Sequence, residues 1–320
     1  LCDRVNTVVP SGDGRRRARR IVTENTWLNA RSQGFDLVHH GGGTAPTIGP
    51  TPIVLTIHDL QYLTHPEYHS KIKLRYLDMT VPRSARRATV VATPSAWVRS
   101  TVIDQLGIQG DRVMVVPHGV EASLGADAPD EETLRRTYAL GSGPVLVFPA
   151  MTHPHKGHEF LLEVMAASWT DPTLRLVLLG GAGRAEASVA EAVSRLGLSD
   201  RVLRPGRVTS ADRDGLIAMA QALVFPSEYE GFGAPVVEAM ALGTPVIAGD
   251  QPAVAEVIGD AGLVLPRSTP AWAPALDVIA RDRDVLVRAG YERAELFTAE
   301  RSGRALAAAY RAAVSTRDDR

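Results

Sequence analysis

Residues 227–249 decide the fold of this chain and read Ser-Glu-Tyr-Glu-Gly-Phe-Gly-Ala-Pro-Val-Val-Glu-Ala-Met-Ala-Leu-Gly-Thr-Pro-Val-Ile-Ala-Gly. They follow an apolar run that predicts a buried strand of a parallel sheet. Gly231 and Gly233 form a turn whose backbone a ligand can approach, and Pro235 suits the first position of a short helix. Gly243 ends this helix before a second apolar run. The stretch therefore predicts a strand, a glycine turn, a helix and a strand of an α/β protein.

The glycine turn predicts a binding site for a ligand that is half anion and half polyol. A glycine loop before a helix presents free amide N–H groups and the positive end of the helix dipole, which suit a phosphate. Glu230 and Glu238 flank this turn, and their carboxylates would repel a phosphate unless they face hydroxyls. A sugar nucleotide has this composition. The alternative is an ordinary βαβ unit in which both glutamates are merely solvated.

The string from Glu230 to Val246 resembles the Glu-x7-Glu signature of the family-4 retaining glycosyltransferases. The resemblance extends over residues 35–312 and includes 54–60, 117–121 and 256–263. It implies the α/β fold called GT-B, in which two Rossmann-like domains with parallel sheets face each other. The implied enzyme class is a hexosyltransferase, similar to mannosyltransferases of polysaccharide biosynthesis.

The composition is that of a globular protein with room for two domains. Of the 320 residues, 45% are hydrophobic and 22% are charged, and the net charge of -1 favours neither nucleic acid nor an anionic membrane. The single Cys2 excludes an internal disulfide framework and fits a reducing cytoplasm. No apolar run is long enough to span a bilayer. We therefore expect a cytoplasmic protein without a nucleic-acid partner, whose membrane contact, if any, is peripheral at the inner face.

The resemblance also implies a division of the chain. Residues 1–125 are expected to form the acceptor-side domain, 126–143 a linker, 144–300 the donor domain, and 301–320 a helix that returns to the first domain. The first domain has too few strands for a complete sheet and begins at Leu1, so we expect two strands to be missing from this chain.

Two features of the first domain are candidates for function. The apolar run 53–57 predicts a strand that delivers His58 at its carboxyl end, where open α/β sheets bind ligands. A histidine there is usually structural, but the resemblance implies that His58 faces the transferred sugar. Arginines gather at 15–20 in a predicted helix over 15–31, and they could meet acidic lipid headgroups or an anionic acceptor. Such a cluster is more often a solvated face.

In the second domain, Lys156 follows a predicted strand and precedes a predicted helix. The resemblance implies that this lysine neutralises the diphosphate leaving group and that the backbone near Val208 lies against the nucleobase. Many family members carry an arginine a few residues before the lysine, where this chain has 151–153, Met-Thr-His. Either His153 or His155 assists, or Lys156 works with backbone amides alone.

These assignments predict a retaining glycosyltransferase without metal or cofactor, since no Asp-x-Asp triad stands at a strand end. It would move a sugar from a nucleotide-diphosphate sugar to a hydroxyl of a glycan, polysaccharide or lipid-linked glycan. Glu238 is expected to accept the ribose hydroxyls and Glu230 to hold a hydroxyl of the donor sugar. The expected catalytic residues are His58 and Glu230, and the expected donor-binding residues are Lys156, Gly231, Phe232, Gly233, Glu238 and Val208.

Two other functions fit the same residues. One is a nucleotide-sugar epimerase on the same fold; a phosphorylase would need a pyridoxal lysine, for which the sequence has no motif. The other is a non-catalytic remnant that binds sugar nucleotides. Retention could proceed through an enzyme nucleophile or through same-face attack assisted by the departing phosphate, and the resemblance favours the second. The sequence identifies neither the donor, the acceptor and the linkage nor the oligomeric state.

Overall fold

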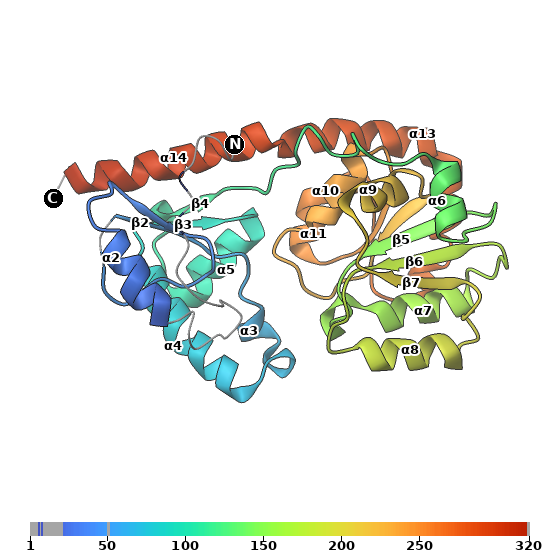
Figure 1. Cartoon of the computed structure of the whole chain (residues 1–320), viewed down its shortest axis with the longest axis horizontal. Coiled ribbons are helices and arrows are strands. Elements are labelled where there is room, and N and C mark those ends of the chain that lie inside the picture. Colours follow the sequence, from blue (N-terminus) through green and yellow to red (C-terminus); the bar gives the residue numbers. More distant parts are fainter. Residues whose placement is uncertain (1–5, 7, 9–21, 50–51, 319–320) are drawn as a thin grey trace.

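The computed structural model describes residues 6, 8, 22–49 and 52–318, which form two parallel sheets, each with its own helices (Figure 1). The first sheet has the order β1-β2-β3-β4 and lies in the amino-terminal half. Its strands are β1 (Val38–His40), β2 (Ile53–Thr56), β3 (Val90–Thr93) and β4 (Val113–Val115).

The second sheet lies in the carboxyl-terminal half and has the order β10-β9-β8-β5-β6-β7. Its strands are β5 (Val145–Pro149), β6 (Arg175–Leu179), β7 (Val202–Gly206), β8 (Ala222–Phe225), β9 (Val246–Gly249) and β10 (Leu263–Leu265). All the pairs described in both sheets are parallel, so the expected α/β class with two parallel sheets is confirmed. The strand order reverses between β5 and β8, and open α/β sheets bind ligands at such a reversal.

Side-chain caps mark the starts of two helices in the amino-terminal half. Ser70 accepts a hydrogen bond from the backbone of Lys73, and Ser95 accepts one from the backbone of Val98. The helices of the amino-terminal half are η2 (Glu24–Leu28), α2 (Asn29–Arg31), α3 (Gln61–Thr64), η3 (Pro66–Tyr68), α4 (Lys71–Arg87), α5 (Ala96–Leu106) and η4 (Gly110–Arg112).

Helices cover both faces of the second sheet. In Figure 1, α7 and α8 lie on one face, and α9, α10 and α11 lie on the other. The helices of this half and of the chain end are α6 (Glu131–Thr137), η5 (Pro154–Lys156), α7 (His158–Ala167), α8 (Glu186–Arg195), α9 (Ser210–Ala218), α10 (Ala234–Ala241), α11 (Pro252–Ile258), α12 (Thr269–Trp272), α13 (Ala275–Ala294), η6 (Glu295–Phe297) and α14 (Ala299–Asp318).

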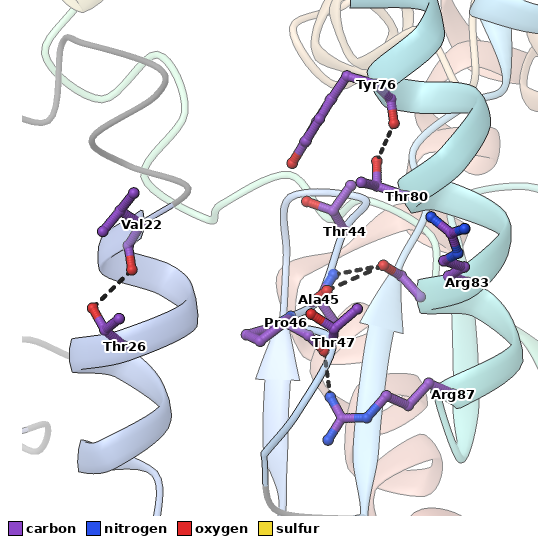
Figure 2. Close-up of a pocket in the computed structure, with 11 residues that line it drawn as sticks. Val22, Thr26, Thr44, Ala45, Pro46, Thr47, Tyr76, Thr80, Arg83 and Arg87 are labelled. Carbon is purple, nitrogen blue, oxygen red and sulfur yellow. Dashed lines mark hydrogen bonds between the residues drawn. The ribbon is translucent and has the colours of Figure 1, made fainter.

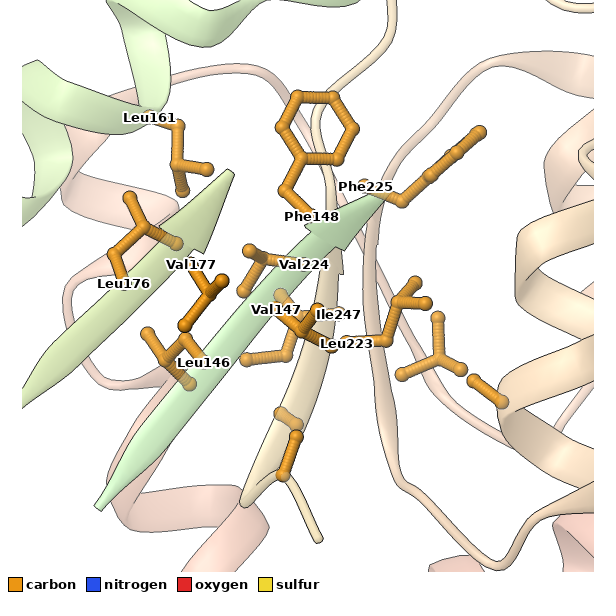
Figure 3. Close-up of a cluster of buried hydrophobic side chains, with 14 of the residues drawn as sticks. Leu146, Val147, Phe148, Leu161, Leu176, Val177, Leu223, Val224, Phe225 and Ile247 are labelled. Carbon is orange, nitrogen blue, oxygen red and sulfur yellow. The ribbon is translucent and has the colours of Figure 1, made fainter. Parts of the chain in front are cut away.

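The core of the carboxyl-terminal half lies between its central strands and these helices (Figure 3). Phe148 on β5 and Phe225 on β8 are fully buried and meet edge to face, with ring centroids 6.0 Å apart. β5, β8 and β9 are buried on both faces, which explains their near-continuous apolar sequences. This rigid centre holds the loops at the carboxyl ends of β5 and β8.

The chain end packs against the amino-terminal half. α13 lies on α10, and α14 then crosses to the first sheet (Figure 1). Ala309 and Ala313 of α14 are fully buried in one cluster with Val54, Val90 and Ala92 of that sheet. The small alanine side chains allow the helix to approach the strands closely.

Some expectations fall on residues outside the described part of the chain. The arginines at 15–20 are among them, whereas the expected helix over 15–31 is described from Val22 and includes one π turn. The domain limits and the missing first strands stay predictions. Within the described ranges, we find no helix with the length and apolar character needed to cross a membrane.

Candidate active site

Lys156 and Glu230 meet at the reversal of the second sheet. Lys156 is the last residue of η5, which follows β5, and Glu230 lies in the loop after the neighbouring strand β8. The ammonium Nζ is 2.5 Å from the carboxylate Oε1, and the two side chains are only 20% and 14% exposed. Parallel strands end at the same edge of a sheet, so this contact follows from the topology. The structure therefore brings together two of the residues that the sequence singled out.

The loop from Glu230 to Gly233 touches the amino-terminal half directly. A Cβ on Gly231 would lie 1.9 Å from the carbonyl oxygen of His58, so only glycine fits at this position. The hydroxyl of Ser95 donates a hydrogen bond of 2.8 Å to the Gly231 carbonyl. Gly233 has a φ of 91° and leads into α10. This helix begins at Ala234, so Pro235 takes the second position and not the expected first.

Gln251 holds the same loop from the other side. Its amide Nε2 donates a hydrogen bond of 3.0 Å to the carbonyl of Glu230, while its Oε1 accepts one of 3.0 Å from the backbone of Val254. Gln251 is buried, so both bonds are shielded from water. The start of α11 thus fixes the backbone of the Glu230 loop.

Glu238 lies apart from the Lys156–Glu230 pair. Its Oε1 is 3.5 Å from Nη2 of Arg213, and its side chain is 19% exposed. Burial raises the pKa of Glu238, and the Arg213 guanidinium opposes this rise. Among the described residues, no hydrogen bond or ion pair joins Glu238 to Lys156 or Glu230. Arg213, whose place beside Glu238 no sequence pattern indicates, lies on α9 and also pairs with Asp214 at 2.9 Å.

His58 joins a column of rings that crosses between the halves. Its Nε2 is 2.9 Å from the carbonyl oxygen of Gly41, and its ring stacks on His118 with centroids 5.4 Å apart. The His118 ring meets the edge of Phe232 at 5.1 Å. Burial, with a smaller effect of His58, lowers the pKa of His118. His58 and Phe232, which the sequence predicts as site residues, are therefore connected through His118, for which the sequence predicts no role.

The two histidines near the usual arginine position both have lowered pKa values. Burial and then the Lys156 ammonium lower the pKa of His155 to about 3. Burial and the nearby Arg184 lower the pKa of His153. Their rings stack with centroids 5.8 Å apart. Both shifts favour the neutral imidazole, and whether one of these histidines assists Lys156 or the lysine works with backbone amides alone stays a prediction.

Arg207 and Val208 lie in the loop after β7. A Cβ on Gly181 would lie 2.9 Å from Nε of Arg207, so the arginine side chain lies against the glycine turn after β6. Val208 is half-buried and packs against the core. The expected approach of a nucleobase to Val208 stays a prediction.

Further contacts between the halves were not anticipated from the sequence. Tyr68 of η3 donates a hydrogen bond to Glu228, and Arg267 pairs with the same carboxylate. Arg184 donates a hydrogen bond to the Tyr68 carbonyl. Glu256 of α11 accepts hydrogen bonds from the first backbone amides of α5. The contacts of Tyr68 with Glu228, of Arg184 with Tyr68 and of Glu256 with α5 join residues more than a hundred positions apart in the sequence, so no local pattern indicates them.

Metal ligands do not cluster in the described ranges: no group of three or more His, Cys, Asp or Glu side chains there could hold an ion. The expectation of a reaction without metal stays a prediction, because its test is a measurement of activity.

Comparisons with known proteins agree with this architecture. The chain matches the family models Glycosyltransferase Family 4 over residues 2–124 and Glycosyl transferases group 1 over residues 130–294. It is 29% identical over 259 residues to the O-antigen chain mannosyltransferase B of Escherichia coli. The aligned region covers 78% of this chain and 68% of that protein. It is 31% identical over 243 residues to the D-inositol 3-phosphate glycosyltransferase of Kineococcus radiotolerans, covering 68% and 56%.

The fold is also similar to solved structures. Anabaena HepE in complex with UDP and glucose matches with a TM-score of 0.71 and 20% identity, over 88% of this chain and 79% of that one. The likeness confirms the expected GT-B arrangement of two facing α/β halves.

Proposed function

The chain belongs to the group 1 glycosyl transferases, and from this premise we propose that it is a retaining glycosyltransferase that needs no metal. It moves a hexosyl group from a nucleotide-diphosphate sugar to a hydroxyl of a glycan acceptor. The relatives named above support a mannosyl donor first, and an acceptor that is a polysaccharide chain or an inositol phosphate. Anabaena HepE, with UDP and glucose bound, supports the nucleotide sugar.

The observation that carries this proposal is the contact of Lys156 with Glu230 beside the backbone of His58. In the free enzyme, the ammonium and the carboxylate neutralise each other in a site that largely excludes water. An arriving diphosphate offers Lys156 a partner of higher charge, which releases Glu230 to accept a hydrogen bond from a donor-sugar hydroxyl. As the bond to the sugar breaks, negative charge grows on the leaving phosphate, and Lys156 with the amides near Gly231 stabilises it.

The proposed reaction retains the sugar configuration by same-face attack. In the donor complex, Glu230 holds a hydroxyl of the donor sugar and so forms no covalent intermediate with the anomeric carbon. The acceptor hydroxyl then attacks from the face that the diphosphate leaves, and a phosphate oxygen takes its proton. His58, at the border of the amino-terminal half, positions the sugar between the two.

Substitution of the pair tests the assignment. Lys156→Met and Glu230→Gln are each expected to lower kcat for sugar transfer by about 10²–10³-fold, because each removes a preorganised charge from the reacting centre. Transfer is measured with GDP-mannose, UDP-glucose and ADP-glucose after a thermal-shift screen for the donor that binds. Glu163→Gln, at an exposed position on α7, is the matched control and should transfer at the original rate.

Undiminished transfer by both site variants would overturn the assignment. Analysis of the products separates the alternatives: an epimerised sugar nucleotide without acceptor would identify an epimerase, and donor binding without any turnover would identify a non-catalytic binder.

A further inference from the structure

We propose that Arg213 is a positioning residue of the donor site. Its guanidinium, fixed by Asp214, holds the Glu238 carboxylate in the orientation in which it accepts the ribose hydroxyls of the donor. This inference rests on the proposed function, because Glu238 is expected to bind the ribose of a nucleotide sugar. It adds to the site a side chain to which no sequence pattern assigns a role.

Arg213 and Glu238 come from the two helices that follow the predicted nucleotide-binding loops. Arg213 lies in α9, which follows the loop of Val208, where the nucleobase is expected. Glu238 lies in α10, which follows the loop of Gly231, where the diphosphate is expected. The ion pair joins these helices, with Nη2 of Arg213 3.5 Å from Oε1 of Glu238. A nucleotide held by both loops would place its ribose between them, next to this pair.

Asp214 fixes the direction of the Arg213 guanidinium. Nε and Nη2 of Arg213 lie 3.1 Å and 2.9 Å from Oδ1 of Asp214. The other carboxylate oxygen of Asp214 accepts a hydrogen bond of 3.2 Å from the backbone of Gly125, in the segment between β4 and α6. Asp214 is only 7% exposed, so water competes little for these contacts. The guanidinium therefore keeps one direction, in which Nη2 also reaches Glu238.

Packing of the core holds the two helices at a fixed distance. Ile217 of α9 and Val236 of α10 are fully buried in the same hydrophobic cluster. The hydroxyl of Thr244, which follows α10, donates a buried hydrogen bond of 2.7 Å to the Ile217 carbonyl. The distance between the two charged side chains is therefore set by the core and not by a surface loop.

The charge of Arg213 also suits Glu238 to ribose. Burial raises the pKa of Glu238, the Arg213 guanidinium lowers it, and the Asp214 carboxylate raises it. An ionised carboxylate accepts hydrogen bonds with both oxygens, whereas a protonated one uses part of this capacity to hold its proton. Ribose offers two neighbouring hydroxyls as donors. Arg213 thus favours the form of Glu238 that can accept from both.

Arg87 on α4 shows how an arginine with a purely structural role differs. Its guanidinium donates hydrogen bonds to the backbone carbonyls of Pro46 and Gly49, and Figure 2 shows the contact with Pro46. These acceptors are neutral groups of a loop in the amino-terminal half. Arg213 pairs instead with two carboxylates, one of which the sequence predicts to bind the donor. Arg87 is therefore the matched control for Arg213.

The test measures binding of nucleoside diphosphates by calorimetry, without an acceptor. The ligands are UDP, GDP or ADP, whichever stabilises the chain in the thermal-shift screen, and its 2′-deoxy analogue. We expect the wild-type chain to prefer the ribonucleotide by about tenfold or more, because the deoxy analogue loses a hydrogen bond to a charged group. Arg213→Met should weaken ribonucleotide binding by about tenfold and reduce the preference to about twofold.

Two further variants separate positioning from stability. Arg213→Lys keeps a cation beside Glu238 and should recover most of the preference. Arg87→Met should lower the melting temperature but keep the preference of the wild type, because it removes structural hydrogen bonds only. A double-mutant cycle with Glu238→Gln shows whether Arg213 acts through Glu238: Arg213→Met should change the affinity little once Glu238 has lost its charge.

An unchanged preference in Arg213→Met would overturn the inference, and so would additive effects in the cycle or equal losses in Arg213→Met and Arg213→Lys. If the wild-type chain bound no nucleoside diphosphate, the proposed function would fail and this inference with it. If Glu238→Gln kept the preference, the expected ribose contact would be wrong, and the role of Arg213 with it. A preference that is lost in Glu238→Gln but kept in Arg213→Met would refute the role of Arg213 alone.

Discussion

At the scale of single residues, Gly231 controls the distance between the donor loop and the amino-terminal half. The added Cβ of Gly231→Ala would lie 1.9 Å from the carbonyl oxygen of His58. The two atoms nearest to this Cβ, the carbonyl oxygen and carbon of His58, belong to the backbone and cannot turn away. The halves must move apart, so we expect kcat/KM for transfer to fall by about 10²-fold, the usual effect of a displacement of about 1 Å in an active site.

Steady-state kinetics and a thermal melt measure the Gly231 effect. Gly303→Ala on α14 is the matched control, because its added Cβ meets nothing within 4 Å. This control should keep full activity and gain up to about 1 kcal/mol of stability from better helix propensity. If Gly231→Ala kept normal kinetics, the close approach would have no functional role.

The sequence indicated this glycine but not the reason for it. Gly231 was expected to bind a diphosphate, whereas the structure adds that its missing side chain makes room for His58. The positions of Lys156 and Glu230 could be predicted, because both follow apolar runs that end at one sheet edge. Arg213 beside Glu238 and His118 beside His58 could not, because each contact depends on how separate elements pack.

At the scale of elements, Glu256 of α11 caps a helix of the other half. Its two carboxylate oxygens accept hydrogen bonds of 2.8 Å each from the backbone amides of Ala96 and Trp97, at the start of α5. The positive end of the α5 dipole strengthens this contact. Glu256→Ala should weaken the contact between α11 and α5 by about 1 kcal/mol, as loss of a helix cap does. We therefore expect KM for the donor to rise roughly fivefold, with a smaller change in kcat.

Kinetics at two salt concentrations check the role of Glu256, because the carboxylate is exposed and its attraction to the helix start is screened by salt. Glu256→Gln keeps one acceptor oxygen and should lie between the wild type and Glu256→Ala. An equal effect on KM and kcat, or no gain with glutamine, would contradict a positioning role. Helices and strands themselves could be predicted from periodicity and caps such as Ser70 and Ser95, but contacts between α5 and α11 leave no local pattern.

At the scale of the whole molecule, buried histidines make stability depend on pH. His158 packs on Phe148 with ring centroids 4.6 Å apart and is 2% exposed, and burial lowers its pKa to about 4. An unfolded histidine has a pKa of about 6.5, so below that pH the unfolded chain binds a proton that the folded chain does not. Stability is therefore complete above pH 6.5 and falls as the pH decreases, by about 2 kcal/mol from pH 7.5 to 5.0 for this residue.

Denaturant unfolding at pH 7.5 and 5.0 measures this loss. His158→Gln removes the titrating group, so its free energy of unfolding should change less between the two pH values than that of the wild type. His65→Gln, in a loop outside the core, is the control and should keep the full difference. Equal pH dependence in all three proteins would show that His158 does not titrate as its burial implies.

The docking of α14 has a consequence for synthesis of the protein. Its alanines cover Val54, Val90 and Ala92 of the first sheet, yet they follow all the described strands in the sequence and leave the ribosome after them. Until α14 is made, the first sheet exposes hydrophobic side chains to solvent, and these can aggregate with other nascent chains. Cells that stop translation near residue 300 should therefore accumulate insoluble fragments, although all the described strands have already been made.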